Sequence, residues 1–139
     1  MTDYLLDTNI ISEVTKTAPS PTLLDWLGAQ DDRRLFISSL TVGEIRRGIL
    51  SMPPGRRRNA LEAWFAGADG PLSLFAGRIL SFGTKAALKW ADLMAAGDRG
   101  GRRRSAIDMM IAAVALANDS VVVTANAKDF DGIEIFYPR

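Results

Sequence analysis

Short apolar runs alternate along the chain with segments of helical period. Three of these runs end at polar or turn residues, as the buried strands of a parallel sheet do: Tyr4–Leu6, Leu35–Ile37 and Val121–Val123. Between them, apolar residues recur every three or four positions, which predicts helices around Leu23–Leu27, Val42–Ile49 and Leu61–Phe65. Strands that alternate with helices predict an α/β fold with a central parallel sheet flanked by helices.

The second half of the chain continues this alternation. Helical period predicts helices at Thr84–Ala96 and Ser105–Asn118, and two further short apolar runs, Ile79–Leu80 and Ile133–Ile135, bring the sheet to four to five strands. The chain is broken at the Pro-Pro-Gly of positions 53–55 and at the glycine-rich positions 97–101. Neither break is long enough to separate domains, so residues 1–139 are expected to form one domain.

The amino-acid composition limits which catalytic chemistry is possible more than it limits which fold is possible. The chain has 139 residues, of which 47% are apolar and 24% charged, as in an ordinary globular domain. It has no cysteine and no histidine, which leaves mainly carboxylate chemistry. No apolar run approaches the roughly 20 residues that span a bilayer, and the N-terminus lacks the basic start of a signal peptide. We therefore expect a cytoplasmic protein.

Three acidic residues stand where the predicted helices begin. Asp7 directly follows the first strand, Glu44 comes after the second, and Asp108 lies near the start of the last long helix. Each one alone also fits a helix cap or a capping box, so a capping role and a site role both remain open. As a set they carry more information, because the carboxyl ends of parallel strands line the crevice where ligands bind.

A cluster of carboxylates at that crevice predicts a bound cation. Carboxylates about 4 Å apart repel by roughly 4 kcal/mol per pair at an effective dielectric of 20. Oxygen ligands without nitrogen or sulfur suit Mg²⁺ or Mn²⁺. After the last long strand, Thr124, Asn126 and Asp129 reach the same edge. Thr124 or Asn126 could hold a water or a metal indirectly, and a turn with its own side-chain hydrogen bonds explains them equally well.

Arginines are unevenly placed although the formal net charge is only +1. They form three runs, each of which is either a solvated surface or a set of phosphate contacts: Arg46–Arg47, Arg56–Arg58 and Arg102–Arg104. The last run stands immediately before the Asp108 helix.

Four segments together resemble the PIN-domain nucleases of the VapC toxin type: Leu6–Ile11, Ser38–Glu44, Asp108–Ala113 and Val123–Phe130. Their order, their spacing and the chain length are typical of this family, and the Leu-Asp-Thr-Asn-Ile-Ile-Ser opening resembles its FitB-like branch. The resemblance implies a three-layer sandwich, Mg²⁺ or Mn²⁺ bound by Asp7, Glu44 and Asp108, and cleavage of RNA by metal-activated water that leaves 5′-phosphate and 3′-hydroxyl ends. Many relatives have a fourth acid where this chain has Asn126, and Asp129 is a candidate substitute.

The resemblance also implies partners. Relatives are homodimers held inactive by an antitoxin protein whose tail lies in a groove near the acidic pocket, and such complexes assemble on DNA. Trp26 and Trp64 are candidates to line the groove, and they are equally explained as core or dimer residues. Arg102, Arg103, Arg104 and Thr124 are the candidate RNA contacts.

Three other functions fit parts of the pattern. A magnesium-dependent phosphatase or phosphoacceptor domain also uses acids at strand ends, but Asp7-Thr8-Asn9 lacks the Asp-x-Asp pattern of the haloacid phosphatases. A non-catalytic binding module of a DNA-bound repressor complex would use the acids only as helix caps. A glycosidase with two carboxylates ranks last, because no sugar-stacking aromatic cleft is visible.

Overall fold

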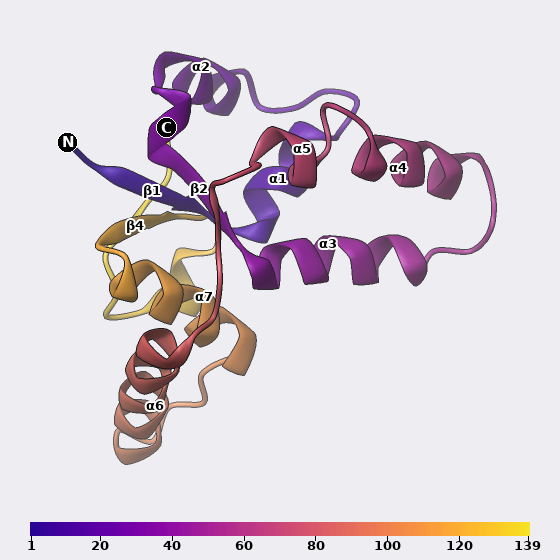
Figure 1. Cartoon of the computed structure of the whole chain (residues 1–139). Coiled ribbons are helices and arrows are strands. Elements are labelled where there is room, and N and C mark those ends of the chain that lie inside the picture. Colours follow the sequence, from indigo (N-terminus) through magenta and orange to yellow (C-terminus); the bar gives the residue numbers. More distant parts are fainter.

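The computed structural model describes all residues, 1–139, and shows a three-layer α/β sandwich (Figure 1). Five parallel strands form the middle layer in the order β3-β2-β1-β4-β5, with β1 at the centre. Their bounds are Asp3–Leu6 (β1), Leu35–Ser38 (β2), Ile79–Leu80 (β3), Ser120–Val123 (β4) and Ile135–Phe136 (β5). The predicted α/β class and the upper end of the predicted strand count are confirmed.

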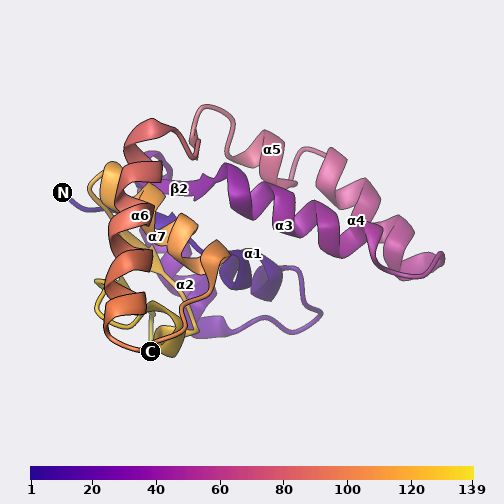
Figure 2. The ribbon, with the colours of Figure 1, turned by 90° about the horizontal axis from the view of Figure 1, so that it is seen from below.

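Helices cover both faces of the sheet. On one face lie α6 (Thr84–Arg99) and α7 (Ala106–Ala117). On the other lie α1 (Thr8–Val14), α2 (Pro21–Ala29), α3 (Ser39–Leu50) and the short α5 (Pro71–Leu74). Helix α4 (Arg56–Ala66) packs on α3, and the two form a hairpin that projects from the sheet (Figure 2). Two 3₁₀ turns, η1 (Asp32–Arg34) and η2 (Ala127–Phe130), complete the chain.

The alternation of side chains along the strands divides the core in two. Leu5 and Val122 face α7, whereas their neighbours Leu6 and Val123 face α1, and all four are buried. This period of two is what a strand buried on both faces requires. The two apolar layers fix the strand register, and with it the position of the residues that leave the carboxyl edge of the sheet.

Two predicted boundaries were wrong. The last strand is Ile135–Phe136 and not Ile133–Ile135. The expected break at positions 97–101 comes later, because α6 continues through Gly97 to Arg99. A Cβ atom on Gly97 would lie 2.9 Å from Cδ of Arg104, so the glycine lets that side chain cross the helix closely. This glycine therefore serves packing and does not end the helix.

No helix in the structure combines the length and the apolar character that crossing a membrane requires.

Candidate active site

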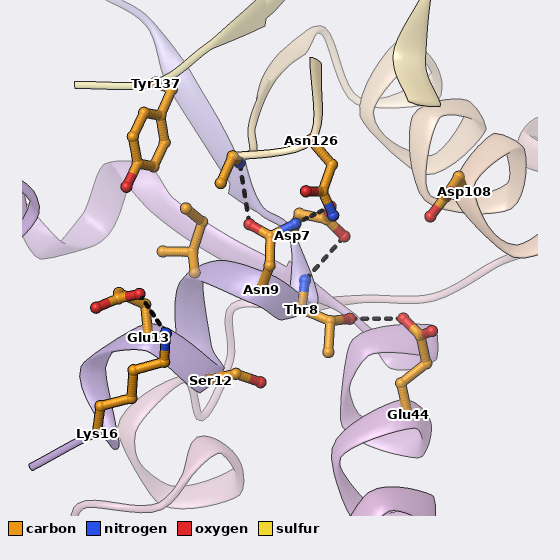
Figure 3. Close-up of a pocket in the computed structure, with 12 residues that line it drawn as sticks. Asp7, Thr8, Asn9, Ser12, Glu13, Lys16, Glu44, Asp108, Asn126 and Tyr137 are labelled. Atoms are coloured by element: carbon orange, nitrogen blue, oxygen red, sulfur yellow. Dashed lines mark hydrogen bonds and ion pairs between the residues drawn. The ribbon is translucent and has the colours of Figure 1, made fainter. Parts of the chain in front are cut away.

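A cavity of about 490 Å³ opens at the carboxyl edge of the sheet and brings together four of the predicted site residues (Figure 3). Asp7 comes from the end of β1, Glu44 from α3, Asp108 from α7 and Asn126 from the turn after β4. Residues far apart in the sequence therefore share one cavity, as the parallel topology predicts.

Asp7 is buried and caps α1 while it also faces the cavity. Its Oδ1 accepts a hydrogen bond from the backbone N–H of Thr8 at 2.8 Å. Its Oδ2 accepts from Nδ2 of Asn9 at 2.8 Å and from the hydroxyl of Thr124 at 2.9 Å. The capping and site interpretations of Asp7 are thus compatible, and three donors hold its carboxylate in one orientation.

Thr124 is fully buried beneath Asp7. Its hydroxyl donates to Asp7, and its oxygen accepts from Nδ2 of Asn9 at 3.0 Å and from the backbone N–H of Asn126 at 3.1 Å. A hydroxyl has one donor and two acceptor positions, so these contacts saturate it. The side chain of Thr124 is thus enclosed and fully hydrogen-bonded within the chain, and its contact with RNA stays a prediction.

Asn9 is the site residue that the sequence analysis missed. Besides donating to Asp7 and Thr124, it accepts a hydrogen bond from the backbone N–H of Ala125 at 3.0 Å. It therefore ties the start of α1 to the turn after β4. Asn9 stands in the conspicuous Asp7-Thr8-Asn9 run, but its partner Ala125 is 116 positions away in the sequence, where a local pattern cannot reveal it.

Glu44 does not cap its helix. Ser38 is the N-cap of α3, and no acid stands in the first turn. Glu44 lies further along the helix, where its Oε1 is 2.6 Å from the Thr8 hydroxyl. The Thr8 hydroxyl is also 3.2 Å from that of Thr41. Because Thr8 has one proton and donates it to Glu44, it accepts from Thr41. The carboxylate of Glu44 is thus oriented by Thr8 of α1, which in turn contacts the buried Thr41 of α3, and not by a helix cap.

Asp108 retains its predicted capping geometry. Its backbone N–H donates to the side chain of Ser105, the N-cap of α7, at 3.2 Å. Its carboxylate faces the cavity from the side opposite Asn9 (Figure 3). Asp108 therefore occupies a helix's first turn and the cavity wall at once.

The surroundings of the cavity disfavour the ionised forms of Asp7 and Asp108. Burial raises the pKa of Asp7, and the charge of Glu44 adds to this, while the Thr124 hydrogen bond opposes it. Burial also raises the pKa of Asp108 to about 6, with further contributions from the charges of Asp7 and Asp129. Carboxylates that raise one another's pKa values form a site that a cation would relieve.

The donor set fits a hard divalent cation. All of the acids offer oxygen ligands, and Asn126 offers an amide at the same cavity. No three acidic side chains are drawn together closely enough to hold a metal on their own. Magnesium commonly binds through one or two carboxylates and keeps several waters, so this open arrangement suits it.

The three loop arginines have different surroundings. Arg102 forms an ion pair with Asp131. Arg104 crosses Gly97 and donates to Sδ of Met109 at 3.2 Å, which makes it partly a packing residue. Arg103 is exposed. These arginines do not line the carboxylate cavity but a second one beside it.

The two tryptophans that were candidates to line the groove, Trp26 and Trp64, lie in different parts of the molecule. Trp26 packs edge-on against Tyr4, with ring centroids 4.9 Å apart, and also contacts Phe136. Trp64 lines a groove of about 320 Å³ between α1, α3 and α4, and Thr8 and Glu44 line the same groove. This groove, which we call the hairpin groove, therefore adjoins the carboxylate cavity.

Comparison with known proteins identifies the class. The family model for the PIN domain matches residues 4–135, and the chain belongs to the PIN-domain family. It is 38% identical over 136 residues to the VapC ribonuclease Y4jK of Sinorhizobium fredii, with 96% of each chain covered. The same identity and coverage relate it to the plasmid stability protein StbB of Pseudomonas syringae pv. tomato.

A solved structure gives the same assignment. FitAB bound to an IR36 DNA fragment contains a chain that matches with a TM-score of 0.87 and 31% identity, covering 97% of this chain and 94% of that one. Within the PIN-domain family the chain thus lies in the VapC and FitB group, and the predicted resemblance is confirmed.

Proposed function

We propose that this protein is a metal-dependent endoribonuclease, formed by a single PIN domain, that acts as the toxin of a toxin-antitoxin pair. The observation that carries the proposal is the convergence of Asp7, Glu44 and Asp108, from three separate elements, on one cavity. The similarity to a VapC ribonuclease over nearly the whole chain supports the same activity.

In this proposal Asp7, Glu44 and Asp108 are the ligands of Mg²⁺ or Mn²⁺ at the cavity, with one or two of them binding directly and the others through waters of the cation. The bound cation would supply an acidified water for attack on phosphorus and would neutralise charge on the phosphoryl oxygens. Asn9 and Thr124 fix the carboxylate of Asp7, and Thr8 fixes that of Glu44. Asn126 stands at the cavity wall as a neutral polar group that can orient the substrate or a water.

The proposed binding partners of the protein are an RNA substrate, an antitoxin protein and a second copy of the chain. An antitoxin segment would lie in the hairpin groove, where it could reach Glu44 without displacing the core. An arginine of such a segment would compete with the cation for the clustered carboxylates. The FitAB structure, which holds DNA, supports an assembly on DNA as well.

The proposal is tested by incubating the purified protein, free of antitoxin, with a structured RNA pool in Mg²⁺, in Mn²⁺ and in EDTA. We expect cleavage with either metal and none with EDTA, and products with 5′-phosphate ends. The Asp108→Asn variant is the matched control. A folded protein that leaves the RNA intact in both metals would contradict the proposal and favour a non-catalytic binding module.

Asn126 gives a prediction on metal affinity. Asn126→Asp adds a carboxylate at the cavity wall, and a charge about 4 Å from another contributes about 1 kcal/mol even at the dielectric of water. We therefore expect at least about fivefold tighter Mn²⁺ binding, measured by isothermal titration calorimetry. Asn118→Asp, at the far end of α7, is the control. Unchanged affinity in Asn126→Asp would show that this wall does not face the cation.

A further inference from the structure

A second cavity of about 370 Å³ lies between the α6–α7 loop and η2, and charged or polar side chains line it throughout. Four of these side chains are cationic and two are anionic, so the cavity carries a net charge of +2. We call it the basic cavity. Its charge is opposite to that of the carboxylate cavity.

Two cations of the basic cavity are free to bind an anion. Arg102 is paired with Asp131, and Arg104 is held against Gly97 and Met109. Arg103 and Lys128 are exposed and form no ion pair. They approach the cavity from different segments, Arg103 from the loop before α7 and Lys128 from η2.

Two segments of the chain contribute lining residues to both the basic cavity and the carboxylate cavity. At the start of α7, the N-cap Ser105 lines the basic cavity, and Asp108 in the first turn lines the carboxylate cavity. After β4, Asn126 lines the carboxylate cavity and Lys128, two residues later, lines the basic one. The same two segments thus form walls of both sites, which places the sites side by side.

We propose that the basic cavity binds a backbone phosphate of the RNA next to the one that is cleaved, and that Arg103 and Lys128 are its ligands. This inference rests on the proposed function and names a subsite of it. A cavity lined by carboxylates repels a polyanion, and a fixed pair of cations beside it offsets that repulsion. Because Arg103 and Lys128 lie on one side of the carboxylate cavity, they would also fix the side on which the strand leaves the site.

The test measures RNA binding without cleavage. A short fluorescent single-stranded RNA is titrated with the full-length protein in EDTA at several salt concentrations, and the slope of log K against log[salt] is determined. Each phosphate contact in a single strand contributes about −0.7 to this slope. We expect Arg103→Gln with Lys128→Gln to make the slope shallower by about 1.4, and each single variant by about 0.7.

Two controls make the result specific. The pair Lys85→Gln and Lys89→Gln removes the same charge from α6, at the end away from the loop, and is expected to leave the slope nearly unchanged. Lys128→Arg retains the charge and is expected to retain the slope. Equal slopes in the wild type and the Arg103/Lys128 double variant, or an equal loss in the α6 pair, would overturn the inference. Salt-dependent binding that responds to these changes without any metal-dependent cleavage would instead contradict the nuclease proposal alone.

Discussion

Asp108→Asn is expected to abolish most RNA cleavage and, in metal-free buffer, to make the protein more stable. Removal of a group that merely supports a metal ligand costs up to about 100-fold in affinity or activity, so loss of a ligand should cost at least about 100-fold in the cleavage rate. The gain in stability comes from removing a carboxylate whose pKa is raised to about 6 by burial first and by the charges of Asp7 and Asp129 second. The same substitution thus lowers the cleavage rate and raises the stability of the metal-free protein, so the two effects of the Asp108 charge can be measured separately.

The sign of the stability change follows from the two pKa values. An unfolded aspartate ionises near pH 4, whereas the folded one ionises near pH 6, so ionisation favours unfolding of the wild type. The full shift corresponds to about 3 kcal/mol, and solvent screening of this half-exposed group reduces that to about 1 kcal/mol. The advantage of the variant should be absent below about pH 4 and complete above about pH 6.

Thermal unfolding in EDTA at pH 4 and at pH 7.5 measures this effect. We expect the variant to melt about 4 °C above the wild type at pH 7.5 and within error of it at pH 4. Saturating Mg²⁺ should reverse the order, because it stabilises only the protein that binds it. A variant that melts below the wild type in EDTA at pH 7.5 would show that Asp108 is stabilised by its neighbours and not strained by them.

Thr124→Val is expected to weaken both the fold and the metal site without touching a carboxylate. The substitution keeps the shape of the side chain but removes a buried hydroxyl that contacts Asp7, Asn9 and the N–H of Asn126. Leaving buried partners unsatisfied costs about 1–3 kcal/mol. Because Asp7 then loses one of its three donors, Mn²⁺ affinity should fall by about 10–100-fold.

Chemical denaturation and Mn²⁺ calorimetry on the same samples measure these two losses. Thr124→Ser retains the hydroxyl and should recover most of the affinity. Thr22→Val, at an exposed position of α2, is the matched control and should change neither quantity. If Thr124→Val loses stability but binds Mn²⁺ like the wild type, the hydroxyl acts on the fold alone and the orientation of Asp7 does not depend on it.

Local patterns were sufficient to predict the fold and the acids at its carboxyl edge. The apolar runs that end at Asp7 and Thr124 define neighbouring strands, and parallel pairing alone brings their ends together. Asp108 could be placed because a helix's first turn has a recognisable sequence. For Glu44 the local signal was misleading, since Ser38 and not a residue next to the acid begins the helix.

What the sequence did not predict depends on contacts between distant residues. The roles of Asn9 and Thr124 exist only because α1 and the end of β4 meet, although the two residues are 115 positions apart in the sequence. Gly97 resembled a helix end, because the side chain of Arg104 that crosses it cannot be seen in a local pattern. The separation of the loop arginines from the carboxylate cavity likewise depends on how α6 and α7 pack.

The strand order also sets the time at which the carboxylate cavity can form during synthesis of the chain. The central strand β1 is made first, and its partner β4 is made near the end of the chain. At roughly 5–20 residues per second, on the order of ten seconds separate translation of Asp7 from translation of Thr124. Until then Asp7 lacks the hydrogen bond from Thr124, and β1 lacks one of its two neighbouring strands. A growing chain therefore cannot assemble the carboxylate cavity until its translation is nearly complete.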